Sequence, residues 1–436
     1  MTSVPAGTIV APATPVGRSA LAIVRIDGPL SSAILQSLSG TLPDERHAAF
    51  VHLQHKGELL DECVAIRYVA PRSFTGNDLV ELTLHGNPLL VQRVIEAAVD
   101  LGARMAEPGE FTERAVLNGK LDLVQAESVA DLINARTPLQ AKLSLSNLEG
   151  SLSRTASSIR ETLLHVISRL EAALDFSEEG YEFITRDDAL RRIDEAVAST
   201  RELGDTFRRG RATTRGLDAV ILGRPNAGKS TLLNRLVGSE RAIVTPIPGT
   251  TRDIVRETIE IGGLPVTLAD TAGLRESDDV VEGIGVERAR EAARRADIIL
   301  YLIDATAPVE PESFDTLTVR VYTKIDLAAA PAGQIGISVP ANTGIDELLA
   351  KLDAIVREEF AAPEASAVLV NDRQRIAVGE AESALIAART SLMDEHDEQL
   401  VLVDLYRASN ALALLTGAIT HDDVFTEIFH KFCIGK

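Results

Sequence analysis

One octapeptide, residues 223–230, constrains the fold of this chain more than any other feature. Its sequence, Gly-Arg-Pro-Asn-Ala-Gly-Lys-Ser, matches G-x-x-x-x-G-K-S/T between an apolar run and a helix-like segment. Strand, glycine-rich loop and helix are the context of a phosphate-binding loop, because glycines let backbone N–H groups surround phosphate oxygens and the helix N-terminus adds positive charge. We predict that Lys229 contacts the β- and γ-phosphates and that Ser230 binds Mg²⁺. The alternative is a strand-to-helix turn that binds nothing.

Two downstream segments fit the same nucleotide-binding domain. Asp270 follows a short strand at 266–269 and opens the tetrapeptide Asp-Thr-Ala-Gly. A carboxylate at this position can act in the second coordination shell of Mg²⁺. The small residues after it are typical of a mobile loop that senses the γ-phosphate. Residues 245–253, between the two motifs, include two adjacent threonines that could complete the Mg²⁺ shell. Thr251 is the better candidate, since translation-factor-like GTPases, which this segment resembles, carry the same Thr-Thr-Arg-Asp arrangement.

A third segment predicts the base. Thr323-Lys324-Ile325-Asp326 follows an apolar strand at 319–322. An aspartate here accepts from both the N1–H and the exocyclic amine of guanine, which adenine cannot supply, while Lys324 packs its stem on the ring. The segment resembles the guanine signature Asn-Lys-x-Asp, with Thr323 in place of asparagine, so we predict GTP rather than ATP. An ordinary Lys/Asp pair in a turn is the alternative, and Ser338-Val339 matches the last guanine-contacting loop only weakly.

The predicted GTP-binding residues come from four segments of the chain. They are Asn226, Ala227, Gly228, Lys229, Ser230, Thr231, Thr245, Pro246, Ile247, Pro248, Gly249, Thr250, Thr251, Asp270, Thr271, Ala272, Gly273, Thr323, Lys324 and Asp326. Leu274 stands where a Ras-like GTPase has glutamine. Another group must therefore orient the attacking water.

Length and composition limit the other possibilities. A chain of 436 residues is expected to form two or three domains, and 45% apolar residues suffice for several cores. No run approaches the roughly 18 apolar residues of a membrane span, and two cysteines without an export signal indicate the cytoplasm. The formal net charge of −20 argues against holding nucleic acid by bulk electrostatics, although a local basic patch or a partner could supply positive charge.

Apolar patterning divides the chain into five segments. Residues 1–118 alternate strand-like runs, including 20–26 and 79–84, with one helical segment at 89–101. Residues 119–214 show the spacing of long antiparallel helices.

The remaining segments complete the expected fold. Strands and helices alternate over 215–360, where a capping box at 343–346 opens the last helix. A linker at 361–371 leads to helices at 372–436, including an apolar one at 400–415 that ends near Gly417. The helices on either side of the nucleotide unit have no other place to bury their apolar faces. We therefore predict a multidomain α/β plus all-α fold, with a Ras-like P-loop GTPase domain inserted into a discontinuous helical domain.

Motifs outside the nucleotide-binding domain match one family. The chain ends in Cys-Ile-Gly-Lys, residues 270–276 read Asp-Thr-Ala-Gly-Leu-Arg-Glu, and the block 111–123 reads Phe-Thr-Glu-Arg-Ala-Val-Leu-Asn-Gly-Lys-Leu-Asp-Leu. From residue 8 to 436 the chain resembles the bacterial and organellar MnmE (TrmE) family of tRNA-modification GTPases. It departs at Thr323, Val339 and Ser19-Ala20, and in a short stretch between 304 and 321.

The resemblance implies a reaction and partners. Members act as homodimers with the flavoprotein MnmG on C5 of the wobble uridine of certain tRNAs, using a one-carbon unit from tetrahydrofolate and consuming GTP. The N-terminal domain would be folate-binding and mediate dimerisation. Arg25, Glu81, Lys120 and Lys436 fall on positions that contact 5-formyltetrahydrofolate in relatives, and Cys433 becomes a functional candidate near that site. An incidental tail cysteine and isolated surface charges are the alternatives.

The resemblance also implies how hydrolysis is activated. In relatives K⁺ stands where an arginine finger would place its charge. Asn226 matches the family's potassium ligand, with backbone oxygens around Thr245, Ile247 and Thr250. Glu282 matches the glutamate that orients water, so Lys229 and Glu282 are the catalytic candidates. The rival functions are a ribosome-assembly GTPase and a regulatory switch without modification chemistry.

The base assignment gives a testable prediction. Asp326→Asn should shift nucleotide preference from GTP toward xanthosine triphosphate, since an amide donates where guanine also donates. Competition binding with the two nucleotides measures the shift. Unchanged GTP affinity would remove Asp326 from the base pocket.

Overall fold

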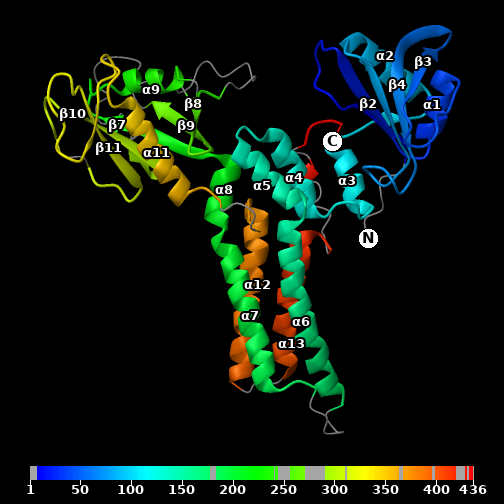
Figure 1. Cartoon of the computed structure of the whole chain (residues 1–436). Helices are drawn as coiled ribbons and strands as arrows, with labels where there is room; N and C mark the ends of the chain where they lie inside the picture. Colours follow the sequence, from blue (N-terminus) through cyan, green and yellow to red (C-terminus); the bar gives the residue numbers. More distant parts are fainter. Residues whose placement is uncertain are drawn as a thin grey trace. The chain divides into compact units, whose positions relative to one another are not determined.

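The computed structural model describes residues 7–176, 183–239, 241–243, 256–270, 290–309, 312–362, 367–394, 398–418, 428–429 and 432–435. Backbone proximity divides the chain into two compact units (Figure 1). The first unit is Met1–Ala130, Leu148–Leu164 and Tyr406–Lys436; the second is Asp131–Asn147 and His165–Leu405.

A six-stranded mixed sheet organises the N-terminal part of the first unit. Its order is β3-β4-β5-β2-β1-β6, and only β1 and β6 pair in parallel among adjacent strands. The strands are β1 (Ile9–Pro12), β2 (Leu21–Asp27), β3 (Ala49–His55), β4 (Glu58–Tyr68), β5 (Leu79–His85) and β6 (Arg104–Met105). The two strands expected from the sequence are therefore confirmed as β2 and β5.

Three helices accompany this sheet, rather than the single one expected. The predicted helix is confirmed as α2 (Pro88–Asp100), which Asn87 caps by accepting from the Leu89 N–H at 3.0 Å. The sequence missed α1 (Ser31–Ser39) and α3 (Glu110–Leu117). Helices this short are marginal on their own, so packing decides whether they form. α1 buries Ile34, Leu35 and Leu38 in the same apolar core as α2 and the sheet.

A buried ion cluster fixes α3 to the sheet. The Arg114 side chain is 1% exposed, and its guanidinium donates to Asp27 Oδ1 at 2.8 Å and to Glu110 Oε1 at 3.0 Å. Thr75 and Asn77 donate to the same Asp27 carboxylate. The cluster thus joins α3, the end of β2 and the segment 71–77, and it gives a structural role to the Arg of the 111–123 block.

Helices before and after the nucleotide-binding domain lie side by side in the second unit. They are α7 (Arg186–Asp205) and α12 (Asp372–Met393), neighbours in Figure 1. Arg201 Nε lies 2.9 Å from Glu382 Oε1, and Arg389 pairs with Asp194. The predicted discontinuous helical domain is therefore confirmed. The remaining helices outside the two sheet-containing domains are α4 (Leu123–Asn134), α5 (Pro138–Leu148), α6 (Ser151–Asp175), α8 (Phe207–Arg215) and α13 (Glu398–Thr416).

The predicted end of the apolar C-terminal helix is correct. α13 ends at Thr416, and Gly417 follows with φ 81°. Ala418 N–H then donates to the Ala413 carbonyl at 2.9 Å, which satisfies one of the last helical carbonyls.

The inserted domain is a second six-stranded sheet, ordered β12-β11-β10-β7-β9-β8 (Figure 1). All neighbouring strands are parallel except β8 and β9. Its elements are β7 (Leu217–Gly223), α9 (Lys229–Val237), β8 (Arg256–Ile261), β9 (Leu264–Asp270), β10 (Ile298–Asp304), β11 (Leu317–Thr323), β12 (Ile335–Ile337) and α11 (Ile345–Glu359). The strand expected directly before the 223–230 loop is confirmed as β7, and those expected at 266–269 and 319–322 are confirmed as parts of β9 and β11. The α/β plus all-α fold is confirmed as well.

The capping box expected at 343–346 is wrong. The N-cap of α11 is Gly344, at φ 76°, and no side chain caps this helix. Thr343 instead exchanges backbone hydrogen bonds with Ser338 at 3.0 and 2.9 Å. A Cβ on Gly344 would lie 1.9 Å from the Gly336 carbonyl oxygen, so the close approach of two backbones decides this helix start.

The two connections of the inserted domain are packed against each other. A Cβ on Gly210 of α8 would lie 2.1 Å from the Leu369 carbonyl oxygen. Thr206 Oγ1 accepts from Leu369 N–H, and Thr213 Oγ1 accepts from Ala362 N–H, both at 3.0 Å. The segment 361–371, expected as a linker, is thus held against α8 in its described part.

No described helix combines the length and the apolar character needed to cross a membrane.

The buried cluster predicts a large loss of stability when its cation is removed. Arg114→Met should lower the free energy of unfolding by about 3 kcal/mol, because Asp27 and Glu110 stay buried without it. Urea unfolding measures the change. Arg18→Met, at an exposed arginine, is the matched control and should cost under about 0.5 kcal/mol. Equal losses in the two variants would contradict a special role for Arg114.

Candidate functional site: a P-loop and a half-buried ion pair

The candidate nucleotide site lies where the parallel strands of the second sheet end. β7 runs into the phosphate-binding loop at Gly223, β9 ends at Asp270, and β10 and β11 end at Asp304 and Thr323. In the pairing register Asp304 lies opposite Thr323. Because parallel strands share one carboxyl edge, these ends gather the predicted phosphate and base segments at one edge of the sheet.

The loop conformation depends on its glycines. Gly223 has φ 146°, and a Cβ there would lie 2.6 Å from the Leu302 carbonyl oxygen on β10. Gly228 has φ 90° and is the N-cap of α9, while Asn226 also adopts a positive φ of 63°. Turns of this kind bring successive N–H groups toward a common centre, which suits phosphate oxygens.

The lysine of the loop lies over the loop backbone. Lys229 is the first residue of α9, and its Nζ donates to the carbonyls of Gly223 at 2.9 Å and Arg224 at 3.0 Å. Asn226, Ser230 and Thr231 are exposed, and Ala227 is buried in the core. The loop therefore places one ammonium and one hydroxyl at the start of a helix, where the helix dipole also favours an anion.

Asp304, at the end of β10, lies beside the base segment and was not predicted from the sequence. Lys324, at φ 59°, places its Nζ 2.5 Å from Oδ2 of Asp304. The hydrogen bonds from Lys324 and Thr306 hold the pKa of the Asp304 carboxyl at about 2. Asp326 is exposed, as a base-contacting carboxylate should be. The sequence pattern could have identified Asp304, because it is an acidic residue at the end of an apolar strand, like Asp270.

Several predicted residues lie outside the described residues. They are Thr245, Pro246, Ile247, Pro248, Gly249, Thr250, Thr251, Thr271, Ala272, Gly273, Glu282 and Lys436. Asp270 is described as the last residue of β9, without its side chain.

A second cluster surrounds the predicted folate residues of the N-terminal sheet. Arg25 Nε and Nη2 both lie 2.8 Å from Glu81 Oε1, and the Tyr68 hydroxyl donates to Glu81 Oε2 at 3.3 Å. Burial raises the pKa of Tyr68, and the adjacent Glu81 carboxylate raises it further. The guanidinium lies 5.5 Å from the ring centre of Phe74, and its Nη1 is buried with no hydrogen-bond partner among the described residues.

The segment 71–77 brings the third predicted folate residue toward this pair. Lys120 is exposed, and its Nζ donates to the Pro71 carbonyl at 3.1 Å. Asn118, two residues earlier, donates to the Thr75 carbonyl at 2.7 Å. The same segment carries Phe74, so Lys120 and Arg25 contact two parts of one loop.

The described part of the C-terminal motif, residues 433–435, lies against the N-terminal sheet. A Cβ on Gly435 would lie 2.0 Å from the Pro12 carbonyl oxygen, and Gly109 N–H donates to the Cys433 carbonyl at 3.5 Å. β1 pairs with β2 through Ala11 and Arg25, which puts the motif beside the strand that carries Arg25. Cys433 is exposed, whereas burial raises the pKa of the other cysteine, Cys63, to about 12.

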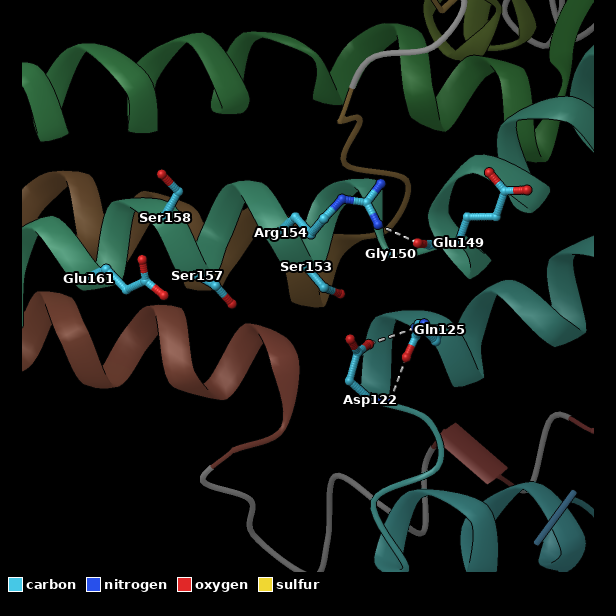
Figure 2. A pocket seen from close by; sticks show the side chains of 9 residues that line it. All are labelled: Asp122, Gln125, Glu149, Gly150, Ser153, Arg154, Ser157, Ser158 and Glu161. Atoms are coloured by element: carbon cyan, nitrogen blue, oxygen red, sulfur yellow. Dashed lines mark hydrogen bonds between the residues drawn. The ribbon is translucent and has the colours of Figure 1, made fainter. Parts of the chain in front are cut away.

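Two hollows of the first unit contain none of the predicted site residues. The larger, of about 510 Å³, lies between the start of β2, the segment 12–17 and α2. The second, of about 390 Å³, is polar, and Figure 2 shows Ser153, Ser157 and Glu161 along one side of α6 within it. Asp122 and Gln125, also drawn there, cap each other's N–H groups at the start of α4.

These features define a class of protein. A mainly parallel sheet whose central strand enters a G-x-x-x-x-G-K-S loop, with Lys-x-Asp at the end of another strand of the same sheet, is a P-loop GTPase domain. Residues 8–120 match the family model "GTP-binding protein TrmE N-terminus", and residues 123–433 match the model "MnmE helical domain". The chain belongs to the MnmE family of tRNA modification GTPases and is a GTP hydrolase.

Full-length relatives support the assignment. The tRNA modification GTPase MnmE of Koribacter versatilis is 41% identical over 98% of this chain and 99% of its own length. The tRNA modification GTPase MnmE of Aquifex aeolicus is 40% identical over 98% of this chain and 99% of its own length. Among solved structures, a variant of Aquifex aeolicus Era bound to GDP·AlF4⁻ is 28% identical over 39% of this chain and 67% of its own length, with a TM-score of 0.26.

Proposed function

We propose that this chain is a K⁺-activated GTPase that, with the flavoprotein MnmG, modifies C5 of the wobble uridine of certain tRNAs using a one-carbon unit from a reduced folate. Family membership supports tRNA modification and GTP hydrolysis. The proposal further assigns residues 1–118 to folate binding and dimerisation, 119–214 and 372–436 to the helical domain, and 215–360 to GTP hydrolysis in a cytoplasmic homodimer.

The observation that carries the folate part is the buried, unpartnered Nη1 of Arg25 within the described part of the chain. A buried cationic N–H without an acceptor is costly, so the site fits a ligand that supplies a carbonyl or carboxylate oxygen. Arg25 would donate to the folate, Glu81 would accept from the pterin N–H edge, and Lys120 and Lys436 would attract the glutamate tail. The folate supplies the one-carbon unit, and these residues bind and orient it.

The nucleotide site fits Mg²⁺ and K⁺ through oxygen ligands. Ser230, at the start of α9, and Thr251 would hold Mg²⁺, with Asp270 behind them. Asn226, exposed on the loop, would hold K⁺ together with Thr245, Ile247 and Thr250. Lys229 would stabilise charge on the β- and γ-phosphates, and Glu282 would orient the attacking water.

The folate assignment predicts a selective loss of binding. Arg25→Ala should weaken 5-formyltetrahydrofolate binding at least about tenfold by calorimetry, because it removes a charge-assisted donor. Arg18→Ala, an exposed arginine in the same domain, is the control and should bind normally. In cells, the wobble-uridine modification should disappear from digested tRNA with Arg25→Ala only. A chain that binds no reduced folate would favour a ribosome-assembly or switch GTPase.

The hydrolysis mechanism predicts a dependence on the cation. K⁺ should accelerate GTP hydrolysis and Na⁺ should not, because the cation supplies transition-state charge at the phosphates. Asn226→Ala should erase the difference between the two salts, measured as phosphate release at equal ionic strength. Equal rates of the native chain in K⁺ and Na⁺ would contradict the assignment.

The water-orienting role is tested in the same assay. Glu282→Ala should lower kcat strongly while GTP affinity stays within a few-fold, since the carboxylate acts in the transition state. Glu276→Ala is the matched control in the same acidic segment. The reverse pattern in the two variants would move the role to Glu276.

A further inference from the structure

The end of β10 carries a carboxylate whose hydrogen bonds point to a role in the base site. One oxygen of Asp304, Oδ1, accepts from the Thr306 N–H at 2.9 Å and from the Thr306 hydroxyl at 2.7 Å. The other, Oδ2, lies 2.5 Å from Nζ of Lys324. The turn after β10 therefore orients the carboxylate, and the carboxylate orients the lysine.

The backbone around Lys324 is also fixed. Ala305 N–H donates to the Thr323 carbonyl at 3.0 Å, which extends the pairing of β10 and β11 to their ends. Lys324 then turns at φ 59°, a conformation uncommon for a residue with a side chain. Leu327 N–H closes the turn on the Lys324 carbonyl at 2.9 Å. Both ends of the lysine side chain, its Cα and its ammonium, are therefore held.

Anchoring both ends of the Lys324 side chain restricts the conformations of its methylene stem. A free lysine side chain loses rotamer entropy when it is ordered. If the side-chain conformation is already fixed before the base binds, this loss of entropy does not lower the affinity for the nucleotide. We propose that Asp304 is a positioning residue of the base site, which holds the Lys324 stem flat against the face that the guanine ring occupies. This inference rests on the proposed place of Lys324 beside the base.

The residue before Lys324 makes this positioning more important in this chain. Thr323 is 5% exposed, and its hydroxyl donates to the Ile303 carbonyl at 3.4 Å. It therefore offers the base no amide donor, unlike an asparagine. Lys324 and Asp326 are left as the base-contacting side chains of the segment, so the fixed lysine carries a larger share of affinity.

Because the Asp304–Lys324 ion pair is partly exposed, its effect on nucleotide binding can be distinguished from its effect on folding stability. The Lys324 and Asp304 side chains are 36% and 22% exposed, and ion pairs this accessible contribute little to folding. Replacing Asp304 should therefore leave the unfolding temperature nearly unchanged while it alters nucleotide binding. A role limited to the fold would give the opposite pattern.

A double-mutant cycle on the full chain tests the inference with fluorescent GTP and GDP analogues. Asp304→Asn should weaken binding about tenfold and speed dissociation, and it should raise KM for GTP more than it lowers kcat. In the Lys324→Met background the same substitution should have no further effect, because Asp304 acts only through the lysine. Asp304→Glu should restore part of the affinity.

Controls separate the possible failures. Asp315→Asn removes an exposed carboxylate from the same domain and should bind GTP normally. Thr306→Val, which removes one bond to Asp304, should weaken binding less than Asp304→Asn and in the same direction. Normal binding by Asp304→Asn, or additive losses in the double variant, would overturn the inference alone. Normal binding by Lys324→Met would overturn the proposed base site as well.

Discussion

An inserted domain must leave and re-enter its host at neighbouring points, and this chain meets that constraint with a glycine in a helix. Gly210 lets the backbone at Leu369 approach α8 to a distance that any side chain would block. Two threonine hydroxyls, at 206 and 213, then accept from the returning segment. Asn147 donates to the Val368 carbonyl at 3.3 Å, and α5 contributes Leu143 to the apolar cluster around that segment.

This arrangement has a mechanical consequence. β7 begins directly after α8, and β7 leads into the phosphate-binding loop. The returning segment connects α11 to α12, and α12 packs on α7. The described parts of both connections are packed against each other, so the nucleotide-binding sheet is joined to the α7–α12 pair through close contacts.

The N-terminal domain uses buried charge in a comparable way. Arg114, Asp27 and Glu110 are almost fully buried, so their ionic hydrogen bonds tolerate little displacement. They hold the segment 71–77, whose Phe74 lies against Arg25 and whose Pro71 carbonyl accepts from Lys120. The family block at 111–123 thus has two roles, since Arg114 is structural while Lys120 reaches toward the candidate site.

The sequence by itself determined the features encoded by contiguous residues. Local patterns predict the phosphate-binding loop and the end of α13 at Gly417. They also predict the strands that end at or just before Asp270 and Asp326. Only the tertiary structure decided which distant residues meet. Asp304 with Lys324, Arg114 with Asp27, and Gly435 with Pro12 are far apart along the chain, and no local pattern encodes such a pairing. The capping box failed for the same reason: the approach of Gly336 to Gly344 is a backbone contact set by the fold, and it overrides a local capping preference.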